Sequence, residues 1–298
     1  MQEVWTADLE TIAAKIVAAI AGGCAASPAE ARCLLREYVA TGRDEVRDAL
    51  GLALAHALEA ATSDEGVEPR TARRAARLIA LVEAAEIADD ERVIAAAGDL
   101  VAQLRGDWPI DLARDGVAAA AASVDACLRA SKLFDPAEIV PPAIDELERI
   151  IASAYRPGGG LRSLTEAREP GAEGARAFQA SDHVAAASAL LTAFEITGRL
   201  PYSMLAEELM QSIRLRADGA SARQTDMAVD CDAAIVLCRL AALHDNAEYR
   251  AAAILAPGAD YRADAARILR DRAPHALAAQ VADAARYAIA LRELISLR

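Results

Sequence analysis

The chain has 298 residues, of which 54% are apolar and 26% are charged, and its formal charge at pH 7 is −13. These proportions exclude a disordered chain, and the negative charge argues against a nucleic-acid partner, because phosphates require clustered Lys and Arg. The longest uncharged run, Ile16 to Ala29, is interrupted by Pro28 and is too short to span a membrane, so no membrane partner is expected.

Apolar residues recur at helical spacing from one end of the chain to the other. Three such stripes are Leu9, Ala13, Ile16 and Ile20; Val184, Ala187, Leu191 and Phe194; and Leu277, Val281, Ala284, Ala288, Leu291 and Ile295. Steps of three and four residues place each stripe on one helix face. Because β-branched residues do not alternate with polar ones over a useful length, we predict no strands and an all-α fold.

Five apolar anchor positions near predicted helix ends are each followed, ten residues later, by an alanine. The anchors are Val39, Ile87, Leu133, Ile196 and Leu243, and the alanines are Ala49, Ala97, Ala143, Ala206 and Ala253. A polar break with Gly, Asp or Pro separates each pair, which is typical of a helix, a short turn and a returning helix. This repeat predicts hairpins over about 28–61, 70–105, 116–155, 182–217 and 230–256.

Two helices, near 6–21 and 275–296, remain without a hairpin partner. Each carries a full apolar stripe, whereas the terminal repeats of an open solenoid have polar outer faces. We therefore predict that these two helices pack together and close a single-domain (α/α)6 toroid over residues 1–298. The segment 157–180 interrupts the repeat with Pro, Gly and charged residues, and is either a lid over the ring or an insertion.

Three segments carry a family resemblance. Residues 182–216 and 228–249 resemble consecutive helix pairs of the six-hairpin glycosidase-like toroids, through Phe194-Glu195-Ile196-Thr197-Gly198-Arg199 and Ala241-Ala242-Leu243-His244-Asp245. They are most similar to the helical part of bacterial thioredoxin-domain proteins related to N-acylglucosamine 2-epimerases. Arg156-Pro157-Gly158-Gly159-Gly160 stands where those proteins have a Gly-rich hairpin. The resemblance implies the toroid scaffold and a relation to carbohydrate-active proteins.

The chain departs from that family where a sugar site would be expected. Leu161-Arg162-Ser163-Leu164 replaces the aromatic residues that follow the glycines, and Ser181-Asp182-His183 replaces Trp-Asn-Gly before the inner helix. Aromatic residues make up only 4% of the chain. These differences predict a toroid that has kept the scaffold without its catalysis, since a fold does not by itself imply a function.

Polar residues at the starts of two predicted inner helices form the candidate site. His183 suits acid–base chemistry because its ordinary pKa lies near neutrality, and the carboxylates of Asp230 and Asp232 suit proton transfer. These three are the candidate catalytic residues. The candidate ligand-binding residues, which would share the mouth of the ring with them, are Asp182, Asp226 and Arg162.

Each of these residues also has a purely structural interpretation. Asp182, or Ser181 beside it, can cap the helix that begins there. Asp226, Asp230 and Asp232 can complement the positive end of the next helix dipole. Asp230-Cys231-Asp232 also weakly resembles the acidic motif of class II terpene cyclases, although Ala233 interrupts the match.

The chain contains no sequence motif for metal binding, phosphate binding or nucleophilic catalysis. The four histidines lie far apart without metal-ligand spacing, and no phosphate-binding or nucleophile motif is present, so we expect no metal and no cofactor. Five cysteines without C-x-x-C spacing, and no signal-peptide pattern, predict a reducing cytoplasm.

Three functions remain open at this point. The favoured one is a non-catalytic or degenerate toroid that binds a small molecule or a protein partner at its funnel mouth. The alternative is a carbohydrate-active enzyme, of glycoside hydrolase or sugar epimerase type, that uses carboxylates in the funnel. The third is an isoprenoid cyclase. The residues that line the funnel distinguish these three: facing carboxylates indicate sugar chemistry, and a deep aliphatic pocket indicates an isoprenoid.

Overall fold

The computed structural model describes residues 2–59, 69–164, 178–217, 226–253 and 258–297. Within these ranges the chain forms thirteen helices and one short hairpin of two strands. In chain order the elements are α1 (Gln2–Ala21), α2 (Pro28–Thr41), α3 (Asp44–Glu59), α4 (Arg70–Ala85), α5 (Glu91–Gly106), α6 (Leu112–Ala130), α7 (Pro136–Ala154), β1 (Tyr155–Arg156), β2 (Gly160–Leu161), α8 (Ala180–Thr197), α9 (Leu200–Ala217), α10 (Met227–Asp245), α11 (Ala247–Ala252), α12 (Tyr261–Ala278) and α13 (Val281–Ser296).

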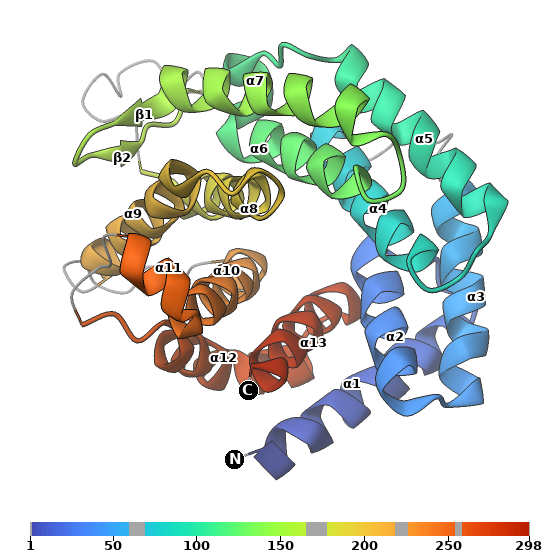
Figure 1. Cartoon of the computed structure of the whole chain (residues 1–298). Coiled ribbons are helices and arrows are strands. Elements are labelled where there is room, and N and C mark those ends of the chain that lie inside the picture. Colours follow the sequence, from blue (N-terminus) through green and yellow to red (C-terminus); the bar gives the residue numbers. More distant parts are fainter. Residues whose placement is uncertain (1, 60–68, 165–177, 218–225, 254–257, 298) are drawn as a thin grey trace, which may run out of the picture.

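The helices form two concentric layers around a central axis (Figure 1). The inner layer consists of α2, α4, α6, α8, α10 and α13, each packed against the next, and α13 returns to α2. The outer layer consists of α1, α3, α5, α7, α9 and α12. The predicted all-α fold, an (α/α)6 toroid, is therefore confirmed.

Local sequence signals explain where the inner helices begin and end. Ser27 and Glu30 form a capping box at the start of α2, so two free backbone N–H groups at that end are satisfied. Gly42 and Gly198, in the left-handed conformation with φ of 67° and 69°, end α2 and α8. Glycine adopts this conformation without steric cost, which allows the sharp return to an outer helix.

The ring closes through the first and last helices, as predicted, because α1 packs against α13. The single helix predicted over 275–296 is wrong, however. Extended backbone at Ala279 and Gln280 separates α12 from α13, and the apolar stripe continues across this break. The outer helix α12 was missed because its buried residues are few and are interspersed with arginines.

The connection after α7 differs from the prediction of no strands. Tyr155 pairs with Leu161 and Arg156 with Gly160, so the glycines form a tight antiparallel hairpin. A Gly-rich hairpin is what the family resemblance implies at this position. Residues 165–177 of the predicted lid or insertion lie outside the described residues, and both interpretations of the segment 157–180 stay open.

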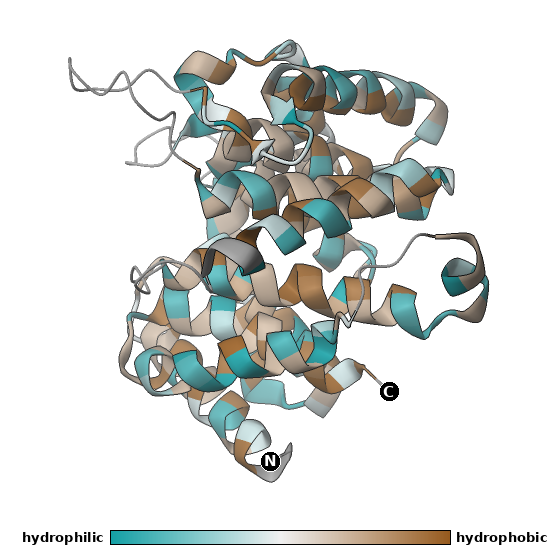
Figure 2. Cartoon of the chain, turned by 90° about the vertical axis from the view of Figure 1, so that its left-hand side faces the viewer, coloured by the Kyte–Doolittle hydropathy of each residue, from teal (hydrophilic) through white to brown (hydrophobic). Residues whose placement is uncertain are grey.

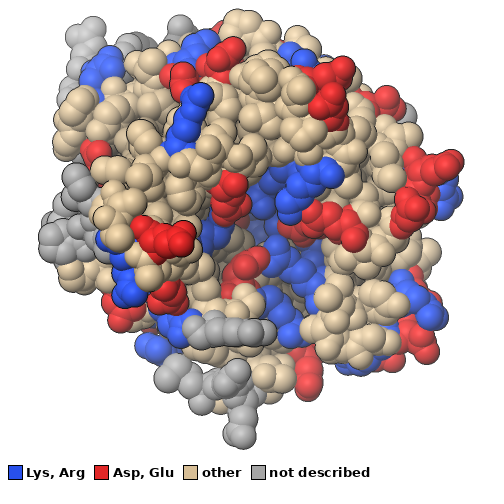
Figure 3. Space-filling model, viewed as in Figure 1, with Lys and Arg blue, Asp and Glu red and all other residues tan. Residues whose placement is uncertain are grey.

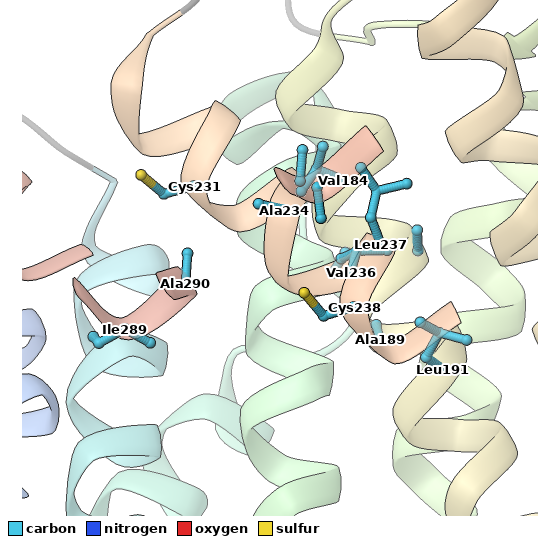
Figure 4. Packing of buried hydrophobic residues seen from close by; sticks show 14 of the residues in the cluster. Val184, Ala189, Leu191, Cys231, Ala234, Val236, Leu237, Cys238, Ile289 and Ala290 are labelled. Atoms are coloured by element: carbon cyan, nitrogen blue, oxygen red, sulfur yellow. The ribbon is translucent and has the colours of Figure 1, made fainter. Parts of the chain in front are cut away.

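The wall between the helices is packed mainly with small aliphatic side chains. Figure 4 shows such packing between α8, α10 and α13, with Ala234 and Ala290 among the fully buried residues. Small side chains allow helix axes to approach closely. Four of the repeat alanines, Ala49, Ala97, Ala143 and Ala206, are buried on successive outer helices, which gives the sequence repeat its structural meaning.

Seen from the side, the helices lie stacked beside one another, and hydrophilic and hydrophobic residues alternate along each of them (Figure 2). This is the pattern of helices with one face in a core and one face in water. None of the described helices has the length and apolar character that crossing a membrane requires.

Candidate functional site

The centre of the ring is a hollow in which charged side chains gather (Figure 3). We call this hollow the lumen. Its charges come from the inner helices, where ion pairs join neighbours: α2 to α4 through Arg32 and Glu83, α10 to α8 through Arg239 and Glu195, and α13 to α10 through Arg286 and Asp232. The lumen is therefore polar, in contrast to the aliphatic wall around it.

Asp125 on α6 is a carboxylate of the lumen that is bonded to three different residues. It accepts hydrogen bonds from Arg129 Nε at 3.1 Å, from Ser188 Oγ at 2.9 Å and from Thr192 Oγ1 at 2.5 Å. Arg239 lies beside it and donates to both hydroxyl-bearing residues. Burial raises the pKa of Asp125, but Arg129 and Arg239 outweigh this effect, so its pKa lies below the ordinary value.

Asp232 on α10 is the contrasting carboxylate. Its side chain is 53% exposed to the lumen, and its nearest cation, Arg286 Nη1, lies 3.8 Å away, so the pairing is loose. The surrounding inner helices partly desolvate this carboxyl group, which raises the pKa of Asp232; Arg286 and Arg32 oppose the rise, and the charges of Asp226 and Asp125 add to it. Asp232 is thus an accessible carboxyl group that holds its proton to higher pH than an ordinary aspartate.

The opposite side of the lumen is neutralised by a second set of ion pairs. Arg32 binds Glu83 through two hydrogen bonds of 3.0 and 2.7 Å, and Arg36 bridges Glu83 and Glu293. Burial raises the pKa of Glu83, but Arg32 and Arg36 outweigh it and lower the pKa to about 2. Glu83 is therefore fixed as an anion and is occupied by its arginines.

The aspartates predicted from sequence lie on different faces of α10. Asp230 pairs with Arg272 of the outer helix α12, so it faces away from the lumen, whereas Asp232 faces into it. Asp226 is the N-cap of α10 and accepts from the backbone N–H of Ala228 at 3.1 Å. Of these three candidates, the structure places only Asp232 among the charges of the lumen.

The candidates near the start of α8 hold the fold together locally. Asp182 is not the N-cap of α8, a position that Gln179 takes; it accepts instead from the backbone N–H of Ala118 on α6, at 3.0 Å. The helical φ/ψ of α6 are broken at Gly116, so Asp182 caps the helix that resumes after this residue. Burial raises the pKa of Asp182 to about 6, and the hydrogen bond from Ala118 opposes the rise.

His183 fastens the Gly-rich hairpin to α8. Its Nε2 accepts from the backbone N–H of Leu161 at 3.0 Å, so the proton resides on Nδ1, which donates to the carbonyl of Gln179 at 2.9 Å. Its side chain is fully buried. Arg162, which follows the hairpin, is exposed, and its backbone N–H donates to Ala154.

Sequence reasoning missed the residues that make the lumen polar. Asp125 and Arg129 are four residues apart, as are Ser188 and Thr192, and each pair interrupts a helix that otherwise consists mainly of Ala, Val and Leu. Isolated polar residues at helical spacing inside an apolar helix are a signal for an inner polar face. Among the described residues, no group of three His, Cys, Asp or Glu side chains has the geometry of a metal site.

The aromatic residues add little to the lumen. Trp5 lies on the outer helix α1, and Trp108, in the turn between α5 and α6, donates to Ser123. On the inner helices, Tyr287 is fully buried and Phe194 packs against Tyr249 of α11. The lumen can therefore offer ion pairs and hydrogen bonds, and offers little surface on which a sugar ring could stack.

The architecture and a charged lumen together define the class of protein, a six-hairpin (α/α)6 toroid. The chain is similar in structure to GH76A, an α-1,6-mannanase from Salegentibacter sp. HEL1_6. An inactive variant of that enzyme, with two adjacent aspartates changed to asparagine and α-1,6-mannotriose bound, matches with a TM-score of 0.68 and 11% identity over 97% of this chain and 98% of that one. A second structure of the mannanase matches with a TM-score of 0.63 and 11% identity, over 91% and 88% of the two chains.

These similarities establish the scaffold. No protein-family model matches the sequence, and no curated protein matches it. At 11% identity, the shared backbone carries the fold and leaves the chemistry to the residues of this chain.

Proposed function

We propose that this protein is carbohydrate-active: that it binds a short, hydroxyl-rich substrate in the lumen and uses Asp232 as a proton donor. The observation that carries the proposal is the contrast between two lumen carboxylates. Asp125, on α6, has a lowered pKa and is held by arginines, whereas Asp232, on α10, is exposed and has a raised pKa. Glycoside chemistry commonly uses two carboxyl groups whose pKa values differ: the one with the lower pKa is ionised, and the one with the higher pKa acts as the acid.

The other lumen groups suit a sugar or a related polyhydroxylated molecule. Carboxylates, guanidinium groups and the hydroxyls of Ser188 and Thr192 are complementary to sugar hydroxyl groups, which both donate and accept hydrogen bonds. The lack of tryptophan on the inner helices argues for a short substrate held by polar contacts over a stacked polymer. The backbone similarity to a mannanase supports this class of substrate.

A pair of single substitutions tests the proposal against the sequence-based hypothesis. Asp232→Asn removes the proton donor, and we expect kcat to fall about 10²- to 10⁴-fold on whichever substrate a panel of manno-, gluco- and N-acetylglucosaminyl oligosaccharides identifies. Asp230→Asn alters a carboxylate two residues away that faces α12. We expect it to change kcat much less.

The two outcomes separate the hypotheses because both substitutions are isosteric. Equal losses in Asp230→Asn and Asp232→Asn would favour the sequence-based site, in which both aspartates act. Full activity in Asp232→Asn would refute its role as the proton donor. Thermal unfolding of both variants serves as the control for folding.

A second candidate is a toroid that binds a sugar without turning it over. The chain has one adjacent pair of aspartates, Asp89 and Asp90, and it lies in the turn between α4 and α5 and not on an inner helix. Asp90 caps α5 and pairs with Arg92. The mannanase variant named inactive has two adjacent aspartates replaced, which favours this candidate. Calorimetric binding of a sugar without any product would support it.

The remaining sequence-based hypotheses differ in how well the lumen supports them. An isoprenoid cyclase is not supported by a lumen that ion pairs cross, since such enzymes need an apolar cavity. A protein partner at the funnel mouth, a relation to the N-acylglucosamine 2-epimerases and a cytoplasmic location stay proposals. All five cysteines are unpaired, which is compatible with a reducing compartment.

A further inference from the structure

A pocket opens at the mouth of the lumen, where three inner helices end. It has a volume of about 370 Å³ and lies between the last turns of α2, α4 and α6 and the residues just after them. We call it the mouth pocket. Asp232, the residue proposed above as the proton donor, is not part of its lining.

One wall of the mouth pocket is aliphatic, and part of it is open to water. It consists of Leu35, Val39, Ile79, Val82 and Ile87. Val39 is 62% exposed and Ile87 is 50% exposed, so both belong to the few large apolar residues that the described fold leaves in solvent. Both are anchors of the sequence repeat, which accounts for their placement at inner-helix ends. A clustered, exposed aliphatic surface that lines a pocket is typical of a binding site.

The facing side of the mouth pocket is cationic. Arg36, Arg129 and Lys132 line it together with two carboxylates, Glu83 and Glu86. Glu83 is held by Arg32 and Arg36. The pair of Lys132 with Glu86 is exposed on both sides, so water weakens it and a ligand can compete for the lysine.

Arg129 has hydrogen-bond donors that a ligand in the mouth pocket can use. Within the described residues, the hydrogen bond it donates runs from Nε to Asp125 at 3.1 Å, and its two terminal amino groups make none. Its side chain is 27% exposed. Burial and the neighbouring Arg129 lower the pKa of Arg239, so these two guanidinium groups already repel one another. An added anion at Arg129 would relieve that repulsion and complete a two-pronged contact.

We propose that the mouth pocket binds a linear aliphatic carboxylate, with its chain against Val39 and Ile87 and its carboxylate on the terminal amino groups of Arg129. Lys132 adds a second cation at the rim. The ligand class follows from the lining: the aliphatic residues match an alkyl chain, and the terminal amino groups of Arg129 with the loosely paired Lys132 match a carboxylate. Asp232 lies outside this site, which is joined to the lumen through the hydrogen bond of Arg129 with Asp125.

Binding to the full chain tests the proposal directly, with hexanoate, octanoate and decanoate as probes in isothermal titration calorimetry. Each added methylene is expected to tighten binding about fourfold until the pocket is filled. Decanol, which has the chain without the charge, should bind at least about tenfold more weakly than decanoate. No binding of decanoate at millimolar concentration, or equal binding of decanol, would overturn the proposal.

Two valines of equal exposure provide a matched pair of variants. Val39→Asp places a negative charge in the mouth pocket, and Val4→Asp places the same charge on α1, where the valine is also 62% exposed. We expect Val39→Asp to weaken decanoate binding at least about tenfold and Val4→Asp to leave it unchanged. The same affinity in both variants would refute the location of the site.

The lysines give a readout that needs no substitution. The chain has two of them, Lys15 on α1 and Lys132 at the pocket. Saturating decanoate should slow acetylation of Lys132 several-fold and leave the rate at Lys15 as it was, measured by peptide mass spectrometry. Unchanged acetylation at Lys132 under saturation would count against the cationic rim.

Discussion

Two faces of α6 hold the ring together by different physics. The face toward the lumen carries Asp125 and Arg129, which are bonded to each other, and Asp125 also accepts hydrogen bonds from Ser188 and Thr192 of α8. The face toward the neighbouring helices carries Val124 and Leu128, which are fully buried in the hydrophobic core. The wall stabilises the fold by excluding water from apolar side chains. The lumen destabilises the fold if a buried charge loses its partner.

The comparison shows how one helix can serve both a scaffold and a site. Alanine, valine and leucine bring the helices close together, which makes the ring narrow and places charges of facing helices within reach of one another. The narrow ring then raises the cost of any charge without a partner. A polar site in such a ring is thus built almost wholly from mutually neutralising residues. The loosely paired Asp232 and the terminal amino groups of Arg129 are the candidates for chemistry and for binding.

The largest expected effect comes from breaking the lumen face. Asp125→Ala leaves Arg129 and Arg239 inside the ring without their shared carboxylate, and we expect it to lower the free energy of unfolding by about 3–5 kcal/mol. Urea denaturation measures this change. In an Arg129→Ala background the same substitution should cost less, and full additivity of the two changes would contradict the coupling.

Lowering the pH should reduce the stability that the ionised Asp125 contributes to the fold. Because the pKa of Asp125 is lowered in the fold, its ionisation contributes stability above the ordinary pKa of an aspartate. That contribution is lost as the pH falls through the lowered value. We therefore expect the cost of Asp125→Asn to shrink as the pH is lowered below about 4. A cost that grows toward acid pH would show that Asp125 is not held ionised.

The next largest loss of unfolding free energy is expected from substitutions on the wall face of α6. Leu128→Ala removes a fully buried side chain and is expected to cost about 2–5 kcal/mol, depending on how far the ring closes around the cavity. Leu128→Met, which nearly conserves volume, should cost less than about 1.5 kcal/mol. Equal costs of the two substitutions in urea denaturation would mean that packing at this position is not limiting.

The smallest effect is expected at the contact between α8 and α6, where a buried carboxylate has no cation paired with it among the described residues. The pKa of Asp182 is raised to about 6, so its ionisation opposes folding: stability is greatest below the ordinary pKa and is lost as the pH rises through about 6. Asp182→Asn can still accept from Ala118 N–H and cannot ionise. Its stability relative to the native chain should rise by at most about 1.4 kcal/mol per pH unit between pH 4 and 6. A pH-independent difference in thermal unfolding would refute the raised pKa.

Much of the fold was predictable because helix periodicity and turn chemistry are local. Steps of three and four apolar residues predicted α1, α8 and most of α13, and Gly42 and Gly198 end α2 and α8 where the polar breaks stand. The repeat of anchors and alanines predicted the first four hairpins, and their four alanines are buried where outer helices meet the inner layer. The fifth hairpin, predicted over 230–256, is wrong, because α10 packs mainly against α12 and only the short α11 lies within those bounds. Closure by the first and last helices followed from their apolar stripes.

The site required the tertiary structure. Asp230 and Asp232 are two residues apart, which is about 200° around a helix, so the sequence determined that they point in nearly opposite directions. Which of the two points inward depends on the neighbours of α10: α12, whose Arg272 takes Asp230, and α13, whose Arg286 faces Asp232. Because α12 was not predicted, the sequence did not show which of the two aspartates faces the lumen. Periodicity relates the faces of one helix to each other, but only packing against other helices decides which face becomes the lumen.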